Sequence, residues 1–121
     1  MSVLLWAGVV VIGGLGSVLR FLVDRTAAQR TATGFPLGTL TVNVTGSLLL
    51  GFVNGLTAVP DVLLLAGVAA IGSYTTFSTW MLETQRLAEE RQLRKAVLNV
   101  VVSLVLGVAA AAVGRLIGAH L

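Results

Sequence analysis

The sequence predicts an all-α membrane protein with four transmembrane helices, forming a single transmembrane domain over residues 1–121. Of its residues, 56% are hydrophobic and only 11% are charged, whereas a soluble domain is usually about one quarter charged. The charges are also bunched, leaving residues 2–19, 31–60, 62–82 and 96–114 uncharged. Each stretch is near or above the roughly 18–20 residues that a spanning helix needs. We therefore predict helices at about residues 3–22, 37–56, 62–82 and 96–116.

The first helix is rich in small residues and ends in a basic one. Small side chains let membrane helices approach closely, and this segment contains Gly8, Gly13, Gly14 and Gly16. Arg20 lies near its end, where an arginine can extend to the lipid headgroups or draw an anion into a vestibule. The polar residues 24–34 then form a predicted connector.

The second helix carries an amide inside an apolar segment. Pro36 stands near its first turn, where the missing N–H costs least. Asn43 lies about two turns further on, and a polar group in hydrocarbon needs a hydrogen-bond partner. Its side chain has two interpretations: a bond between helices, or an N–H donor to an anion.

The third segment starts as a smooth apolar helix over residues 62–71 and then meets a polar run at residues 72–80. A broken helix at membrane depth survives only inside protein or beside a cavity, and such breaks form ion sites in transporters. The carbonyls around 72–75 suit a hard cation such as Na⁺. Residues 82–95 are predicted to form an interfacial or cytosolic helix and turn.

The polar run is followed by groups that suit an anion. Phe77 and Trp80 lie three residues apart and share a helical face if the helix resumes. Their positive ring edges can contact an anion, although ordinary core packing explains the same spacing. In the fourth helix, Asn99 and Ser103 lie one turn apart and form a polar stripe.

The residue inventory excludes several classes of function. No Asp, Glu, Lys or His lies at mid-membrane depth, so proton-coupled transport is disfavoured. The only histidine, His120, is next to last, and no nucleophile–base pair or metal-ligand spacing indicates an enzyme. Absent cysteines exclude disulfides and thiolate metal sites. The basic residues flank membrane spans, so nucleic acid is not an expected partner. A passive, donor-lined anion path beside a structural cation remains.

Four segments, taken in order, resemble the Fluc/CrcB family of fluoride channels. They are the glycine-rich residues 13–20 ending in Arg20, the P-L-G-T-L-T-V-N-V-T-G run at 36–46, the G-S-Y-T-T-F-S-T-W run at 72–80, and S-L-V-L-G at 103–107. The resemblance covers the whole chain. Any one match is weak, but four in this order are specific.

The resemblance implies a multi-pass protein of the cell inner (plasma) membrane that forms an antiparallel, dual-topology dimer with two fluoride pathways. It implies a central structural Na⁺ held by the backbone carbonyls of Gly72 and Thr75. It places a set of side chains along or beside the fluoride path: Arg20 near the entrance, Asn43, Phe77, Ser78, Thr79, Trp80, Asn99 and Ser103. Trp80 stands where the family has a second pore phenylalanine, and Asn99 where tyrosine is common.

The basic residues also predict an orientation. Seven lie on the side of the first and third connectors, namely Arg20, Arg25, Arg30, Arg86, Arg91, Arg94 and Lys95, against Arg115 alone on the other side. Because Lys and Arg favour the cytoplasmic side, both termini are expected outside. An antiparallel dimer then requires either a homologous partner of opposite bias or dual insertion of this chain.

Two other functions were weighed. A small multidrug-type antiporter is also a short four-helix antiparallel dimer, but it needs a glutamate in its first helix, and residues 3–22 contain no acid. A non-transporting membrane assembly subunit would use the glycine-rich faces. Such a subunit would give no function to Asn43 and the polar residues 75–80.

Overall fold

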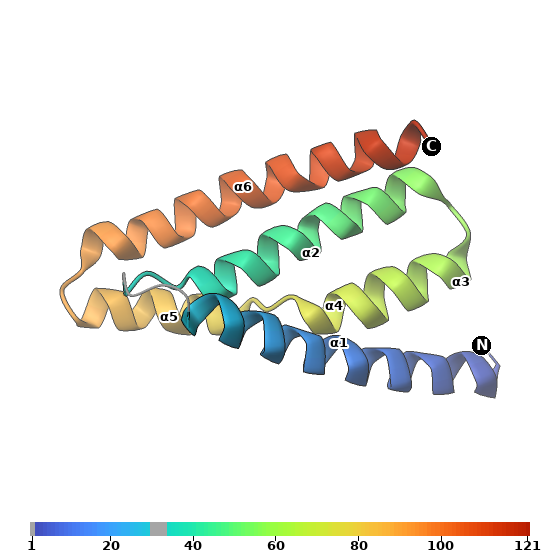
Figure 1. The fold of residues 1–121 in the computed structure, drawn as a ribbon, viewed down its shortest axis with the longest axis horizontal. Coiled ribbons are helices and arrows are strands. Elements are labelled where there is room, and N and C mark those ends of the chain that lie inside the picture. The colour runs from blue at the N-terminus through green and yellow to red at the C-terminus, as the bar shows by residue number, and fades with distance from the viewer. Residues whose placement is uncertain (1, 30–33) are drawn as a thin grey trace.

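The structure, a computed structural model, describes residues 2–29 and 34–121, and this part of the chain is helical with no strand. The elements are α1 (Val3–Gln29), α2 (Leu37–Leu56), a third span made of α3 (Pro60–Val62), the π-helical η1 (Leu63–Ile71), α4 (Gly72–Tyr74) and α5 (Ser78–Glu89), and finally α6 (Leu93–Ala119). Four helices, 3–27, 37–56, 60–89 and 93–119, are long and apolar enough to cross a membrane. The predicted fold class is confirmed (Figure 1).

Two of the predicted helices are longer than expected. The first helix continues to Gln29 instead of ending near residue 22, so Asp24 belongs to the helix and not to a connector. Residues 82–89 are helical, as the end of α5, and a turn follows at residues 90–91, in agreement with the predicted helix and turn. The last helix runs from Leu93 to Ala119, beyond both predicted ends. Charged residues mark the point at which a helix leaves the hydrocarbon core of the membrane. The helix itself continues for as long as its backbone hydrogen bonds continue.

The third span differs from the expected smooth helix. Residues Leu63–Ile71 are wound as a π-helix, and the Gly72 N–H accordingly bonds to the carbonyl of Gly67, five residues back. The interruption lies at residues 75–77 and not at 72–75, because Gly72–Tyr74 is still helical and Thr75 is the first extended residue, at φ −81° and ψ 162°. Long π-helices are rare and single π-turns often occur at functional sites.

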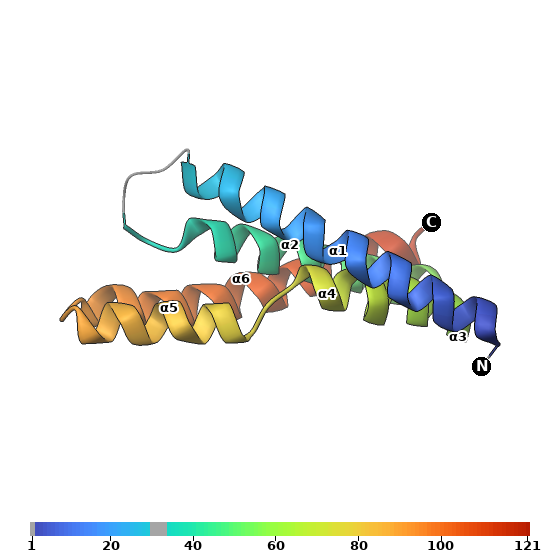
Figure 2. The ribbon, with the colours of Figure 1, turned by 90° about the horizontal axis from the view of Figure 1, so that it is seen from below.

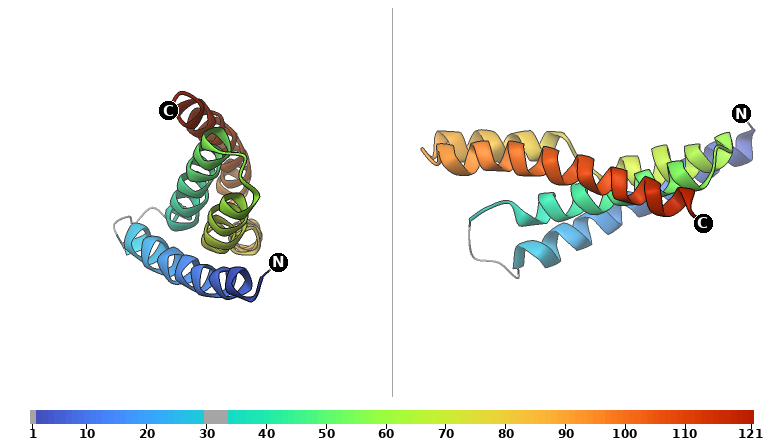
Figure 3. Two further views of the ribbon diagram at one scale, coloured as in Figure 1. Left: turned by 90° about the vertical axis from the view of Figure 1, so that its right-hand side faces the viewer. Right: turned by 90° about the horizontal axis from the view of Figure 1, so that it is seen from above.

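The helices alternate in direction, so both chain ends lie at one end of the bundle (Figure 1). α2 and α6 run side by side in the same direction, and α1 and the third span run the opposite way. α1 packs against α2, η1 and α4, and the view along the bundle shows it on the side away from α6 (Figure 3). Seen from below, the α1–α2 pair and the α5–α6 pair diverge toward the connector end, which is the end of the bundle opposite the two chain termini (Figure 2).

Glycines set the close approach of α2 and α6. A Cβ on Gly51 would lie 2.0 Å from the carbonyl oxygen of Ala111, and a Cβ on Gly114 would lie 2.1 Å from that of Leu48. A Cβ on Gly55 or on Gly118 would likewise lie 2.2 Å from a backbone oxygen of the facing helix. Small residues therefore let the two backbones touch, as is usual for membrane helices.

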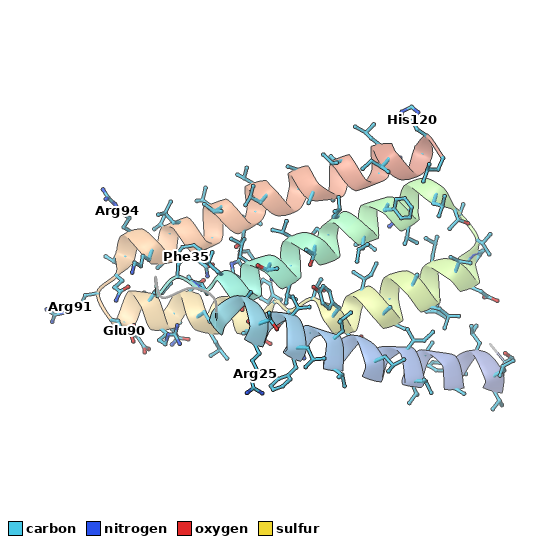
Figure 4. The ribbon with its side chains drawn as sticks, viewed as in Figure 1. Arg25, Phe35, Glu90, Arg91, Arg94 and His120 are labelled. Atoms are coloured by element: carbon cyan, nitrogen blue, oxygen red, sulfur yellow. The ribbon has the colours of Figure 1, made fainter. Side chains whose placement is uncertain are left out.

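The chain exposes much of its apolar surface. Val10 is 72% exposed on α1, and Val105 and Val108 are 60% and 69% exposed on α6. Side chains project outward along both helices (Figure 4). Such a surface in a single chain faces lipid or another subunit, since water disfavours it.

Candidate functional site

The interruption between α4 and α5 is held by one side chain of α2. The Asn43 Nδ2 group donates to the carbonyl of Thr76 at 2.8 Å, and the Thr76 N–H donates to Asn43 Oδ1, also at 2.8 Å. This reciprocal pair satisfies backbone groups that the broken helix would otherwise leave without partners. Asn43 therefore bonds two helices, and the second N–H of its amide is left for another acceptor.

The same interruption leaves carbonyl oxygens unpaired. The Thr76 N–H, which would have reached Gly72 in a continuous helix, is taken by Asn43. The Thr79 N–H bonds to Thr76 Oγ1 at 3.3 Å instead of to the carbonyl of Thr75. Within residues 2–29 and 34–121, the carbonyls of all four residues 72–75, including those of Gly72 and Thr75, have no hydrogen-bond partner.

A cavity of about 480 Å³ lies against this interruption. It is lined by side chains and backbone from α2, η1, the break, α5 and α6. Its lining contains six of the residues that the sequence predicted, drawn from three separate segments of the chain: Asn43, Gly72, Thr75, Phe77, Trp80 and Ser103. Its other lining residues include Ser47, Thr76 and several glycines and apolar side chains. No Asp, Glu, Lys, Arg or His of the described chain lines it.

The two aromatic residues form an edge-to-face pair at the wall of the cavity. Their ring centroids lie 5.8 Å apart at an interplanar angle of 80°. Phe77 is 70% exposed, so within this chain it is not core packing. Trp80 is partly buried, and its Nε1–H donates to the backbone carbonyl of Asn99 at 3.2 Å.

The two residues of the predicted polar stripe on α6, Asn99 and Ser103, have different surroundings. Ser103 lines the cavity, and its Oγ is buried without a hydrogen-bond partner in the described chain. Asn99 is 1% exposed and is absent from the cavity lining; its Nδ2 donates to Thr84 Oγ1 at 2.8 Å. Asn99 thus lies behind Trp80 and outside the cavity lining, because one helical turn also changes the depth and the neighbours of a residue. Its predicted place on the fluoride path stays a prediction.

A second, smaller cavity of about 170 Å³ lies on the other side of Thr76. Its lining includes Arg20 from α1 and Thr79 from α5, together with Asp24 and Thr39. Thr76 lines both cavities. The predicted residue Ser78 is exposed and lines neither.

Sequence reasoning missed several polar residues of the site. Thr84 bonds to Asn99, and the Thr39 hydroxyl donates to the Glu83 carboxylate. Asp24 was missed because it was placed in a connector. A hydroxyl one turn after Trp80 was the available signal for Thr84, since side chains four residues apart share a helix face.

Charged side chains at the two ends of the bundle come from different segments of the chain. Arg91, Arg94 and Glu90 lie at the connector end and His120 lies at the opposite end, with the chain termini (Figure 4). Arg30 falls outside the described residues. In the described part of the chain, no group of three or more His, Cys, Asp or Glu side chains could hold a metal ion.

Residues 7–115 match a family model described as "CrcB-like protein, Camphor Resistance (CrcB)". The chain is 62% identical over 115 residues to "Fluoride-specific ion channel FluC 2" of Mycobacterium tuberculosis, covering 95% of this chain and 91% of that protein. It is 41% identical over 122 residues to "Fluoride-specific ion channel FluC 1" of Leifsonia xyli subsp. xyli, covering 98% and 89%. It is 44% identical over 95 residues to "Fluoride-specific ion channel FluC" of Shewanella halifaxensis, covering 75% and 77%.

Proposed function

This chain belongs to the CrcB-like family, and from that premise we propose that it is a fluoride-selective channel that exports cytoplasmic fluoride passively. One observation carries the proposal. The cavity beside the broken third span joins an unused amide N–H of Asn43, the unpaired hydroxyl of Ser103 and the aromatic pair, with no charged side chain in its lining. Such a surface offers donors to a small anion without trapping it.

The absence of charge in that lining fits electrodiffusion. Fluoride enters acid-exposed cells as neutral HF and ionises in the cytoplasm, so its gradient and the inside-negative potential both drive the anion outward. Export then needs a path that replaces the water shell of the ion. Hydroxyl and amide donors and positive ring edges can do so. A channel of this kind performs no covalent chemistry, and the chain is not an enzyme.

The predicted residues that line the two cavities then have roles on the path. Asn43 and Ser103 donate hydrogen bonds to the ion, and Phe77 presents its ring edge. Arg20 attracts the anion into the smaller cavity, which Thr79 borders. Thr76, common to both cavities, is the point at which the ion would pass between them.

A structural Na⁺ fits the unpaired carbonyls of the break. Carbonyl oxygens are the ligands that bind a hard cation at interrupted membrane helices, and those of Gly72 and Thr75 lack protein donors. Two carbonyls from one chain do not complete a coordination shell, and the described chain has no acidic cluster to add. Bound between two copies, Na⁺ would supply a fixed charge that holds the breaks together.

The site therefore calls for a second subunit. We propose an antiparallel dimer in the cell inner (plasma) membrane, in which the partner covers the cavity and its exposed Phe77. The basic residues gathered at the connector end favour one orientation, with both termini outside. A homologous partner of opposite charge bias meets this need, as the numbered names of the relatives suggest. Dual insertion of this chain is the alternative.

Fluoride efflux from liposomes tests the function. The purified chain, alone and mixed with a homologous partner subunit, is reconstituted into fluoride-loaded vesicles and efflux is followed with a fluoride electrode. We expect efflux far above that of protein-free vesicles, with chloride retained. Efflux from the chain alone would exclude an obligate heterodimer. If no combination releases fluoride, the channel proposal fails.

A further inference from the structure

Trp80 takes part in a ring of three hydrogen bonds that ties α5 to α6. Its indole Nε1–H donates to the backbone carbonyl of Asn99 at 3.2 Å. The Asn99 side chain donates to Thr84 Oγ1 at 2.8 Å, and the Thr84 hydroxyl donates to the backbone carbonyl of Trp80 at 2.8 Å. This ring of hydrogen bonds starts and ends at Trp80. It closes only when α5 and α6 are in the one register that allows all three bonds.

The ring also fixes the direction of each bond. The Thr84 hydroxyl has one proton, which goes to the Trp80 carbonyl, so its oxygen can only accept from Asn99. Asn99 must therefore turn its NH₂ group toward Thr84. The site is buried, since Asn99 is 1% exposed. The Asn99 Oδ1 atom already lacks a hydrogen-bond partner in the described chain. Losing one member of the ring leaves a further buried polar group without a partner, and that is costly.

We propose that Asn99 and Thr84 are positioning residues that lock the Trp80 indole, so that its N–H is withheld from the ion and only its C–H surface lines the cavity. Trp80 lines the cavity and Asn99 and Thr84 do not. The indole N–H, a strong donor that would hold an anion, is already used on the α6 side. Trp80 then presents only C–H groups to the ion, as an apolar aromatic ring does.

The edge-to-face contact extends the lock to Phe77. Phe77 is 70% exposed, and the ring contact that the structure gives it is Trp80, at 5.8 Å and 80°. A fixed indole therefore fixes the orientation of Phe77 at the cavity wall. This inference rests on the proposed channel function for its consequence, but the lock itself is a property of the chain that can be measured without flux.

Fluorescence of Trp80 tests the lock. The background variant is Trp6→Phe, because Trp6 and Trp80 are the two tryptophans of the chain. The chain, in detergent and in liposomes, receives Thr84→Val, which keeps the shape and removes the hydroxyl, or Thr84→Ser, which keeps it. The matched control is Thr41→Val, since the Thr41 hydroxyl also bonds four residues back, to Leu37, with no link to another helix.

For Thr84→Val we expect acrylamide quenching of Trp80 to rise and fluoride efflux to fall by about thirtyfold, the population change that loss of both bonds of the Thr84 hydroxyl produces. Thr84→Ser and Thr41→Val should match the background. In a Trp80→Phe chain, which lacks the N–H, Thr84→Val should lower efflux no further. Non-additivity of this kind identifies residues that act through each other.

The outcomes are separable. Unchanged quenching in Thr84→Val overturns the lock, whether or not efflux changes. A further efflux loss in the Trp80→Phe background shows that Thr84 does not act through Trp80, and also overturns it. Raised quenching with no efflux from any version, including the background chain with a partner, supports the lock while the channel proposal fails. Asn99→Leu, which removes the bond between Asn99 and Thr84 from the α6 side, must also raise the quenching of Trp80.

Discussion

The substitution Asn43→Asp is the sharpest test of an anion path through the larger cavity. It keeps the size of the side chain and one oxygen for the Thr76 N–H, but it loses the N–H donor to the Thr76 carbonyl and adds a negative charge. Asn43 lines the cavity. We therefore expect fluoride efflux to be nearly abolished while chloride stays excluded.

The size of the effect follows from Coulomb's law. A fluoride passing about 4 Å from the new carboxylate meets a repulsion of about 4 kcal/mol at an effective dielectric constant of about 20. Each 1.4 kcal/mol is about a tenfold change, so efflux should fall by about a thousandfold. The assay is fluoride efflux from liposomes, normalised to the amount of monodisperse protein reconstituted.

Two companion variants separate charge from damage. Asn54→Asp adds the same charge to the same helix, but Asn54 is exposed, bonds only to the Leu50 carbonyl and lies outside the cavity; its efflux should be near that of the unsubstituted chain. Asn43→Leu removes both bonds to Thr76 without adding charge, and should conduct more than Asn43→Asp. Efflux of Asn43→Asp within threefold of the unsubstituted chain would remove Asn43 from the path, and equal losses in both Asn43 variants would assign the effect to a distorted break.

Three further results are expected. Phe77→Ile should lower fluoride efflux severalfold without lowering thermal stability, because the ring is 70% exposed; unchanged efflux would show that the ring edge does not contact the ion. Gly51→Ala should destabilise the chain by about 1–3 kcal/mol in detergent melting curves, because its Cβ would lie 2.0 Å from the Ala111 carbonyl, whereas Gly14→Ala, with nothing within 4 Å, should not. Replacing Na⁺ with N-methylglucamine should reduce both efflux and melting temperature, since a ligand bound only to the folded state stabilises it; a chain indifferent to Na⁺ would count against the carbonyl site of Gly72 and Thr75.

The local composition of the chain was enough to predict its spans and the interrupted third one. Uncharged length and hydropathy belong to each segment by itself, so four helices followed directly, and the run of hydroxyls at 72–80 marked the break. The same reasoning placed the break about three residues too early and missed the π-helix of Leu63–Ile71. Both depend on which partner takes the backbone groups, and Asn43 of another helix takes those of Thr76.

The sequence by itself determined that this protein is a membrane bundle with polar groups suited to an anion and a cation near its middle. Only the tertiary structure decided which groups meet. Asn43 reaches across 33 residues to Thr76, Ser103 enters the cavity, and Asn99, one turn earlier, bonds behind Trp80. Each residue turns a helix by about 100°, so a polar side chain faces a cavity, a neighbour or lipid according to how its helix is rotated and packed. That rotation is set by close contacts such as Gly51 against Ala111, which no single segment contains.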